Sequence, residues 1–237
     1  LVGSEMCIRD RAKDVTENMD KFELGIAVQK VYDFIWDEFC DWYVETAKYR
    51  IYHKEEEKAA ADCVLWVLKT VLKQALKLLH PFMPFITEEI YSVLVPEEES
   101  LMMSEWPQFH AEWDFPAEEN VMEHVKEITR GIRNMRAEMN VPNNRKTKVY
   151  VVCEDTEICD GISTLENSIK PLMMAEKILV QQTKENIADN AVSVVVPDAV
   201  VYLPLEDLVD FEQEMERLQK EEEKLKKEIK RAEGMLS

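Results

Sequence analysis

The sequence predicts a mainly α-helical protein: a helical bundle, then a small α/β domain, then a coiled-coil helix. Only five glycines and nine prolines occur among 237 residues, and Glu, Lys, Leu, Ala and Met are abundant, which favours long helices with few tight turns. After Pro142, β-branched residues cluster in short runs typical of strands. An apolar heptad then runs to the end of the chain, which indicates a helix that packs on a partner.

The bundle helices are predicted from apolar spacing and from prolines. Residues 14–52 are nearly free of helix breakers, and apolar side chains recur there at helical spacing: Leu24, Val28, Val31, Ile35, Phe39 and Trp42. The apolar stripe is wider than one neighbour covers, so this helix, or two in tandem, should pack on two sides. Another helix is expected over about 55–80, where Pro81 ends it, and the next runs from Pro84 to a point before Pro96.

A loop and a fourth helix complete the bundle. Residues 97–116 contain prolines and tryptophans without a helical period, so we expect an ordered loop that wraps the bundle, followed by a helix over about 117–139. Four β-branched runs then predict strands, and a helix within 155–175 would cover their sheet; the strands are 147–153, 177–182, 191–196 and 200–203. The predicted domains are a bundle at 12–142, an α/β domain at 143–204 and a heptad helix at 205–237.

The heptad helix is the most regular feature of the chain. Its heptad positions follow alternating three- and four-residue steps, with Glu222 as the one polar member among Leu208, Phe211, Met215, Leu218, Leu225, Ile229, Ala232 and Leu236. Such a stripe needs a partner helix, and none follows in this sequence. Because the chain also starts with Leu1, we expect it to be a piece of a longer polypeptide, with a truncated arm at 205–237.

Charge and composition limit the partners and the compartment. The net charge of −19 makes the average surface repel polyanions, so a nucleic acid would have to meet a local basic patch, and an anionic membrane is disfavoured. No apolar run reaches the roughly 18–20 residues that span a bilayer. The five cysteines form no CxxC pair, and four of them lie beside apolar neighbours as small hydrophobes would. These observations favour a cytoplasmic protein with free thiols.

No motif for bond chemistry is found. The sequence contains no GxGxxG, GxxxxGK[ST] or GxSxG, and five scattered glycines cannot build a backbone cradle for phosphates, so we expect no ATP or other cofactor site. The four histidines are far apart and form no zinc spacing. No catalytic and no metal-binding residue is predicted.

One basic strip is the candidate RNA contact. Lys126, Arg130 and Arg133 share a face of the fourth helix, and four more basic residues follow: Arg136, Arg145, Lys146 and Lys148. They could bind phosphates or pair with Glu123, Glu127 and Glu138, and both readings stay open. In the last helix, Arg217, Lys224 and Arg231 could contact a phosphate backbone, or they could simply be solvated. The aromatic run 34–43 could stack unpaired bases, although its helical spacing is more typical of a core.

Several strings resemble a known family. The string KFELGIAVQKVYDFIWDEFCDWY at 21–43 resembles the anticodon-binding helical domain of bacterial valine–tRNA ligases, which are class I aminoacyl-tRNA synthetases. Four further strings agree in order: LHPFMPFITEEIY at 79–91, SEWP at 104–107, RNMRAEMNVP at 133–142 and VYLPLEDLVD at 201–210. The resemblance covers about 12–237. Residues 1–11 depart from it, so we expect them to be foreign sequence.

The resemblance implies a different role for each part of the chain. The bundle would bind the anticodon stem and loop of tRNA(Val), the coiled-coil arm would lie on the outer corner of the tRNA, and the basic strip would supply phosphate contacts. The catalytic and editing domains, with the ATP site, would lie upstream on the same polypeptide, which is expected to be monomeric. Two alternatives remain: a stand-alone interaction module that uses the heptad stripe, and the equivalent domain of an isoleucine or leucine enzyme.

Overall fold

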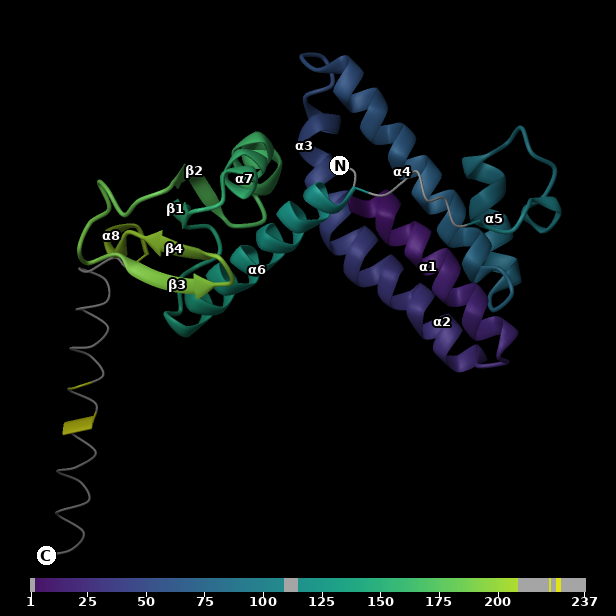
Figure 1. The fold of residues 1–237 in the computed structure, drawn as a ribbon, viewed down its shortest axis with the longest axis horizontal. Coiled ribbons are helices and arrows are strands. Elements are labelled where there is room, and N and C mark those ends of the chain that lie inside the picture. The colour runs from purple at the N-terminus through teal and green to yellow at the C-terminus, as the bar shows by residue number, and fades with distance from the viewer. Residues whose placement is uncertain (1–2, 109–114, 209–221, 223–224, 227–237) are drawn as a thin grey trace, which may run out of the picture. The chain divides into compact units, whose positions relative to one another are not determined.

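The computed structural model describes residues 3–108, 115–208, 222 and 225–226 (Figure 1). It shows a mainly helical domain followed by a small four-stranded mixed sheet. The chain divides into two compact units. Unit 1 comprises Leu1–Val125 and Asp160–Leu172, and unit 2 comprises Lys126–Cys159 and Met173–Ser237.

Unit 1 is built on a helical bundle with one apolar core. Its elements are α1 (Gly3–Asp20), α2 (Leu24–Asp33), η1 (Phe34–Val44), α3 (Glu45–Tyr52), α4 (Lys58–Leu79), α5 (Pro84–Leu94) and the 3-10 turn η2 (Leu101–Met103). Helix α1 packs on both α2 and α4, and α5 packs on α4. The core side chains Val15, Val31, Phe34, Val71 and Leu78 exclude water from these contacts. The predicted bundle is therefore confirmed.

The segment η1 is a π-helix, which the apolar spacing did not predict. Each π turn takes more residues than an α turn, so the buried positions change register. Phe34 and Phe39, five residues apart, both enter the core, while Ile35 is only partly buried. Leu24 is exposed, so its prediction as a core residue was wrong.

Helix α1 already begins at Gly3, inside the segment that departs from the family strings. Ile8 and Ala12 are both buried in the bundle core. Residues of the N-terminal segment therefore take part in the packing of unit 1. The idea that residues 1–11 are foreign concerns their origin and stays a prediction.

The strands of unit 2 form one sheet. Helix α6 (Pro116–Glu138) leads into β1 (Thr147–Cys153), and α7 (Thr156–Ile169) leads from β1 to β2 (Ala175–Gln181); residues 116–125 of α6 and 160–169 of α7 belong to unit 1. The chain then forms β3 (Val192–Val196), β4 (Ala199–Leu203) and α8 (Leu205–Leu208). The strand order is β2-β1-β4-β3, with β1 parallel to β2 and antiparallel to β4. All four predicted strands are confirmed. The predicted helix within 155–175 is shorter than expected, because Pro171 disfavours a helical Lys170.

One face of this sheet carries the apolar packing. Val149, Val151, Val201 and Leu203 are fully buried on it, and they alternate with less buried residues along their strands. Helix α6 covers part of that face, since Gly131 lies directly against the side chain of Val194 (Figure 1).

Three other expectations concern the ends and the cysteines. Of the coiled-coil helix predicted over 205–237, the structure describes α8 and helical residues at 222 and 225–226, and the rest lies outside the described residues. Cys153 and Cys159 are joined by a disulfide, so the expectation of free thiols was wrong for this pair, while Cys40 and Cys63 are free. Within the described part of the chain, no helix is both long and apolar enough to cross a membrane.

Candidate nucleic-acid interface

The structure separates the predicted basic strip into buried and exposed members. Lys126 is 5% exposed and Arg136 is 3% exposed, so neither side chain reaches a ligand on the surface in this conformation. Arg145 is half-buried. The exposed members are Arg130, Arg133, Lys146 and Lys148. Charge pattern alone did not distinguish these groups.

Arg136 holds the turn between α6 and β1. Its Nη2 donates hydrogen bonds to the carbonyl oxygens of Pro142, at 3.0 Å, and Arg145, at 2.6 Å. Burial of the guanidinium lowers the pKa of Arg136 from its ordinary value, because a buried charge loses its hydration. We therefore interpret Arg136 as a structural residue that closes the turn.

Arg145 fixes α8 to the same turn. Its Nε donates to the carbonyl oxygen of Asp207 at 2.6 Å, and its Nη2 donates to that of Glu206 at 3.1 Å. The Asp207 carboxylate in turn accepts a hydrogen bond from the backbone N–H of Lys148 at 3.2 Å. These partners are about 60 residues away in sequence, so no local pattern could have revealed them.

Of the exposed members, Arg130 pairs with Glu127, as the alternative reading of the strip expected; Arg130 Nη1 lies 2.9 Å from Glu127 Oε1. Lys146 and Lys148 flank the buried Thr147, so both side chains leave the start of β1 on the same exposed side. Among the residues that the structure describes, neither lysine ammonium makes an ion pair. The α6–β1 region therefore presents positive charge to solvent.

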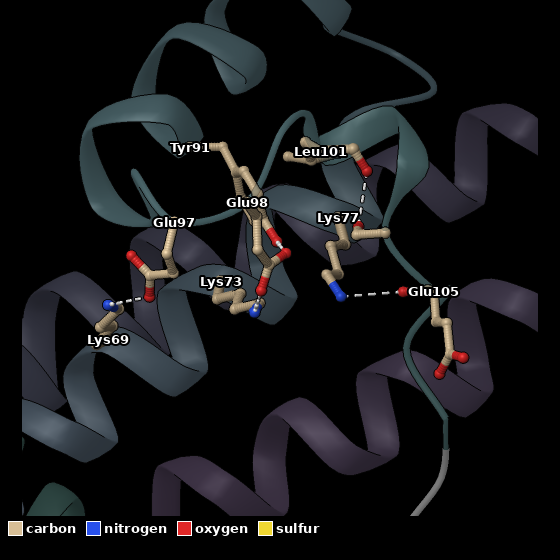
Figure 2. Close-up of polar contacts among 9 residues, drawn as sticks. Lys69, Lys73, Lys77, Tyr91, Glu97, Glu98, Leu101 and Glu105 are labelled. Carbon is tan, nitrogen blue, oxygen red and sulfur yellow. Dashed lines mark hydrogen bonds and ion pairs between the residues drawn. The ribbon is translucent and has the colours of Figure 1, made fainter.

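A second set of lysines is engaged within the fold. Three lysines on successive turns of α4 fasten the segment that follows α5, as Figure 2 shows: Lys69, Lys73 and Lys77. The first lies 3.3 Å from Glu97, the second pairs with Glu98, and the third donates to the carbonyl oxygen of Glu105 at 3.0 Å. Tyr91 on α5 also donates its hydroxyl to Glu98. We call these contacts the lysine ladder, and they hold the described residues 97–105 against α4.

The contacts of the lysine ladder shift the pKa values of its members in different directions. Burial of Lys73 opposes its charge, but its hydrogen bond to Glu98 and the negative charges of Tyr91 and Glu98 together outweigh burial and raise the pKa of Lys73. The same bond, with that from Tyr91, lowers the pKa of Glu98. Burial and the neighbouring Lys73 lower the pKa of Lys77. Because Lys69 and Lys73 already pair with carboxylates, the ladder is a poor candidate for phosphate contact.

The aromatic run 34–43 belongs mainly to the core, as its helical spacing indicated: Phe34, Phe39, Trp42 and Tyr43 are buried. Trp36 is the exception and is 58% exposed. Its ring lies parallel to that of Tyr32, with centroids 6.5 Å apart. Trp36 stands among carboxylates on this surface, including the exposed Asp37, which disfavours an RNA backbone there.

Arg217, Lys224 and Arg231 lie outside the described residues. In the part of the chain that the structure describes, no three His, Cys, Asp or Glu side chains are grouped so that they could hold a metal ion.

The mainly helical fold agrees with a comparison against protein families. Residues 8–151, more than half of the chain, match the family described as the anticodon-binding domain of tRNA ligase. The chain therefore belongs to the anticodon-binding domains of tRNA ligases.

Within that class, the chain is similar to valine–tRNA ligases. It is 47% identical to the valine–tRNA ligase of Clostridium perfringens over 225 residues, which cover 95% of this chain and 25% of the relative. It is 36% identical to that of Oceanobacillus iheyensis over 230 residues, 97% of this chain and 26% of the relative. It is 35% identical to that of Bacillus subtilis over 232 residues, again 97% and 26%. The chain thus spans about a quarter of the length of these relatives.

Proposed function

We propose that this chain is the tRNA-binding part of a valine–tRNA ligase and holds tRNA(Val) while other domains of the same polypeptide attach valine with ATP. The match of residues 8–151 to anticodon-binding domains carries this proposal. The similarity to valine enzymes favours it over the isoleucine and leucine alternative. The protein would act in the cytoplasm, and the whole ligase would be monomeric.

Binding would combine two kinds of contact. Phosphate contacts fix the position of an RNA, while contacts to unpaired bases give specificity. We assign phosphate contact first to the exposed Arg133, Lys146 and Lys148, with Arg130 beside them. Arg136 and Arg145 would support this surface from within, and Lys126 would reach RNA only after a rearrangement.

The proposal also includes the C-terminal helix. Residues 205–237 would form the first helix of a coiled-coil arm that lies along the tRNA, with Arg217, Lys224 and Arg231 facing its backbone. The competing idea of a stand-alone interaction module rests on the heptad stripe, most of which lies outside the described residues.

The experiment compares two charge reversals in the full chain. Arg133→Glu and Lys21→Glu change the net charge equally and alter exposed residues in different units. Binding of a tRNA(Val) transcript is measured by fluorescence anisotropy over a range of salt concentrations. We expect Arg133→Glu to weaken binding about tenfold and to reduce the slope of log K against log salt by about 1, as loss of one phosphate contact does.

Lys21→Glu should leave both quantities close to wild type, and circular dichroism should show the same helix content for all three proteins. Equal binding by Arg133→Glu and wild type at low salt would remove this region from the interface. No binding of tRNA by the wild-type chain at any salt concentration would refute the proposed function itself.

A further inference from the structure

The sheet of unit 2 has a second face, which the described helical segments of that unit leave open. Side chains alternate between the two faces of a strand. Val149 and Val151 of β1 point to the buried face, so Lys148 and Tyr150 point to the other. Strand pairing places residues of all four strands on this open face, among them Lys148, Tyr150, Lys177, Ser193, Val195 and Tyr202.

The open face is accessible to a ligand. Lys148, Lys177, Ser193 and Val195 are exposed, whereas their neighbours on the buried face are covered. Helix α6 packs on the buried face, because Gly131 meets Val194, the residue between Ser193 and Val195.

The chemistry of the open face suits nucleotides. Tyr150 on β1 is paired with Tyr202 on β4, so each of the two central strands places a tyrosine on the open face. Lys148 lies opposite Lys177 on β2, and the Lys184 ammonium is 5.1 Å from the centre of the Tyr202 ring. Aromatic rings stack unpaired bases, and lysines attract the phosphates between them.

A hollow of about 620 Å³ adjoins the open face at the carboxyl end of β1. Val152, Val195 and Val200 form its apolar wall, and its polar lining residues are Gln182, Glu154, Asp155 and Asp198. Lys148 and Lys177 stand at the opposite, amino ends of β1 and β2. The phosphates of a bound strand would therefore lie toward the amino ends of these strands, away from the carboxylates of the hollow.

We propose that this open sheet face binds a short single-stranded stretch of RNA, with bases stacked on Tyr150 and Tyr202 and phosphates near Lys148, Lys177 and Lys184. RNA-binding sheets of four strands use aromatic residues on neighbouring strands in the same manner. The inference extends the proposed tRNA binding, on which it rests for the source of the RNA. The open face would be a second RNA contact besides the α6–β1 region, since most of the face lies beyond residue 151, where the family match ends.

RNA fits this face better than a protein partner does. A flat apolar interface would not need three lysines around two tyrosines, and exposed lysine is depleted at protein interfaces. In a chain of net charge −19, Lys148, Lys177 and Lys184 bring positive charge to the face that carries the two tyrosines.

The test uses the full chain and a fluorescein-labelled single-stranded RNA of eight nucleotides, with a duplex of equal length as comparison. Three tyrosine variants are compared: Tyr150→Ser with Tyr202→Ser, Tyr150→Phe with Tyr202→Phe, and Tyr52→Ser as an exposed tyrosine in unit 1. We expect the double serine variant to bind the single strand at least tenfold more weakly. The double phenylalanine and Tyr52→Ser variants should bind like wild type, because the rings on the face are kept.

Lys177→Gln with Lys184→Gln provides a second measurement that leaves the half-buried tyrosines and Lys148 in place, so it decides the question if the serine variant unfolds. It should lower the salt slope for the single strand by about 1.4. Photo-crosslinking with 4-thiouridine RNA should label peptides from 148–152 and 199–203.

Wild-type affinity in both the serine and glutamine variants, or equal binding of single strand and duplex, would overturn the inference. Arg133-dependent tRNA binding that is insensitive to these variants would overturn it while leaving the proposed function intact. Crosslinking of single strands to the face in a chain that fails to bind tRNA would support the inference and refute the proposed function.

Discussion

Gly131 of α6 packs so closely on β3 that a methyl group does not fit there. A Cβ at this position would lie 2.6 Å from Cγ1 of Val194 and 3.5 Å from Cγ1 of Val196. The φ angle of Gly131 is negative, so alanine is compatible with the backbone and only the packing opposes it. The substitution Gly131→Ala therefore isolates a steric contact between a helix and a sheet.

Two effects of opposite sign decide the outcome. Alanine in place of glycine stabilises a helix interior by about 0.8–1.0 kcal/mol. Overpacking a close contact costs about 1–3 kcal/mol, and valine is restricted at χ1, so Val194 cannot easily turn away. We expect Gly131→Ala to lower the free energy of unfolding by about 1 kcal/mol. Gly25→Ala, where nothing lies within 4 Å, should instead be neutral or slightly stabilising.

The assay is urea unfolding followed by circular dichroism, with hydrogen exchange of β3 amides as a local readout for unit 2. Val194→Ala removes the clashing atom, so Gly131→Ala combined with Val194→Ala should recover about 1 kcal/mol relative to the sum of the single changes. A Gly131→Ala protein as stable as Gly25→Ala, with unchanged exchange in β3, would refute the packing argument.

Two further predictions concern polar contacts. Arg145→Ala removes both hydrogen bonds to α8, so amides of 205–208 should exchange faster and stability should fall by about 1–3 kcal/mol; unchanged exchange there would contradict the anchoring role. Hydrogen bonds from Lys73 and then Tyr91 lower the pKa of Glu98, so its carboxylate stabilises the fold above the ordinary glutamate pKa of 4.5, and this contribution is lost as the pH falls through the lowered value. Urea midpoints between roughly pH 5 and pH 3 should therefore decline less steeply in Glu98→Gln than in wild type, and parallel curves would count against the coupling.

The sequence predicted elements best where a local signal marks an end. Proline placed the end of α4 before Pro81 and the start of α5 at Pro84, and β-branched residues placed β1 at 147–153. The same rule applied to Pro171 would have ended α7 correctly. The π-helix η1 escaped prediction because its side chains fit an α-helical stripe nearly as well.

Contacts between distant residues were not predictable in this way. The opposition of Tyr150 and Tyr202 depends on strand order, which no local spacing encodes. Burial of Lys126 and Arg136 depends on what packs around α6, so a basic pattern on the helix could not separate them from the exposed Arg133. The pairing of Arg130 with Glu127 was visible in the sequence because both residues share one helix face.

The hydrogen bonds of Arg136 and Arg145 have a mechanical consequence. Arg136 binds the carbonyl group of Arg145, and Arg145 binds the carbonyl groups of Glu206 and Asp207. Along the backbone, the connection from Glu138 to Leu208 passes through all four strands. Through the hydrogen bonds of Arg136 and Arg145, the end of α6 is connected to α8 by only two side chains. A pull on α8 would therefore reach the end of α6 through two arginine side chains, besides reaching the sheet through β4 and through the hydrogen bond from Lys148 to Asp207.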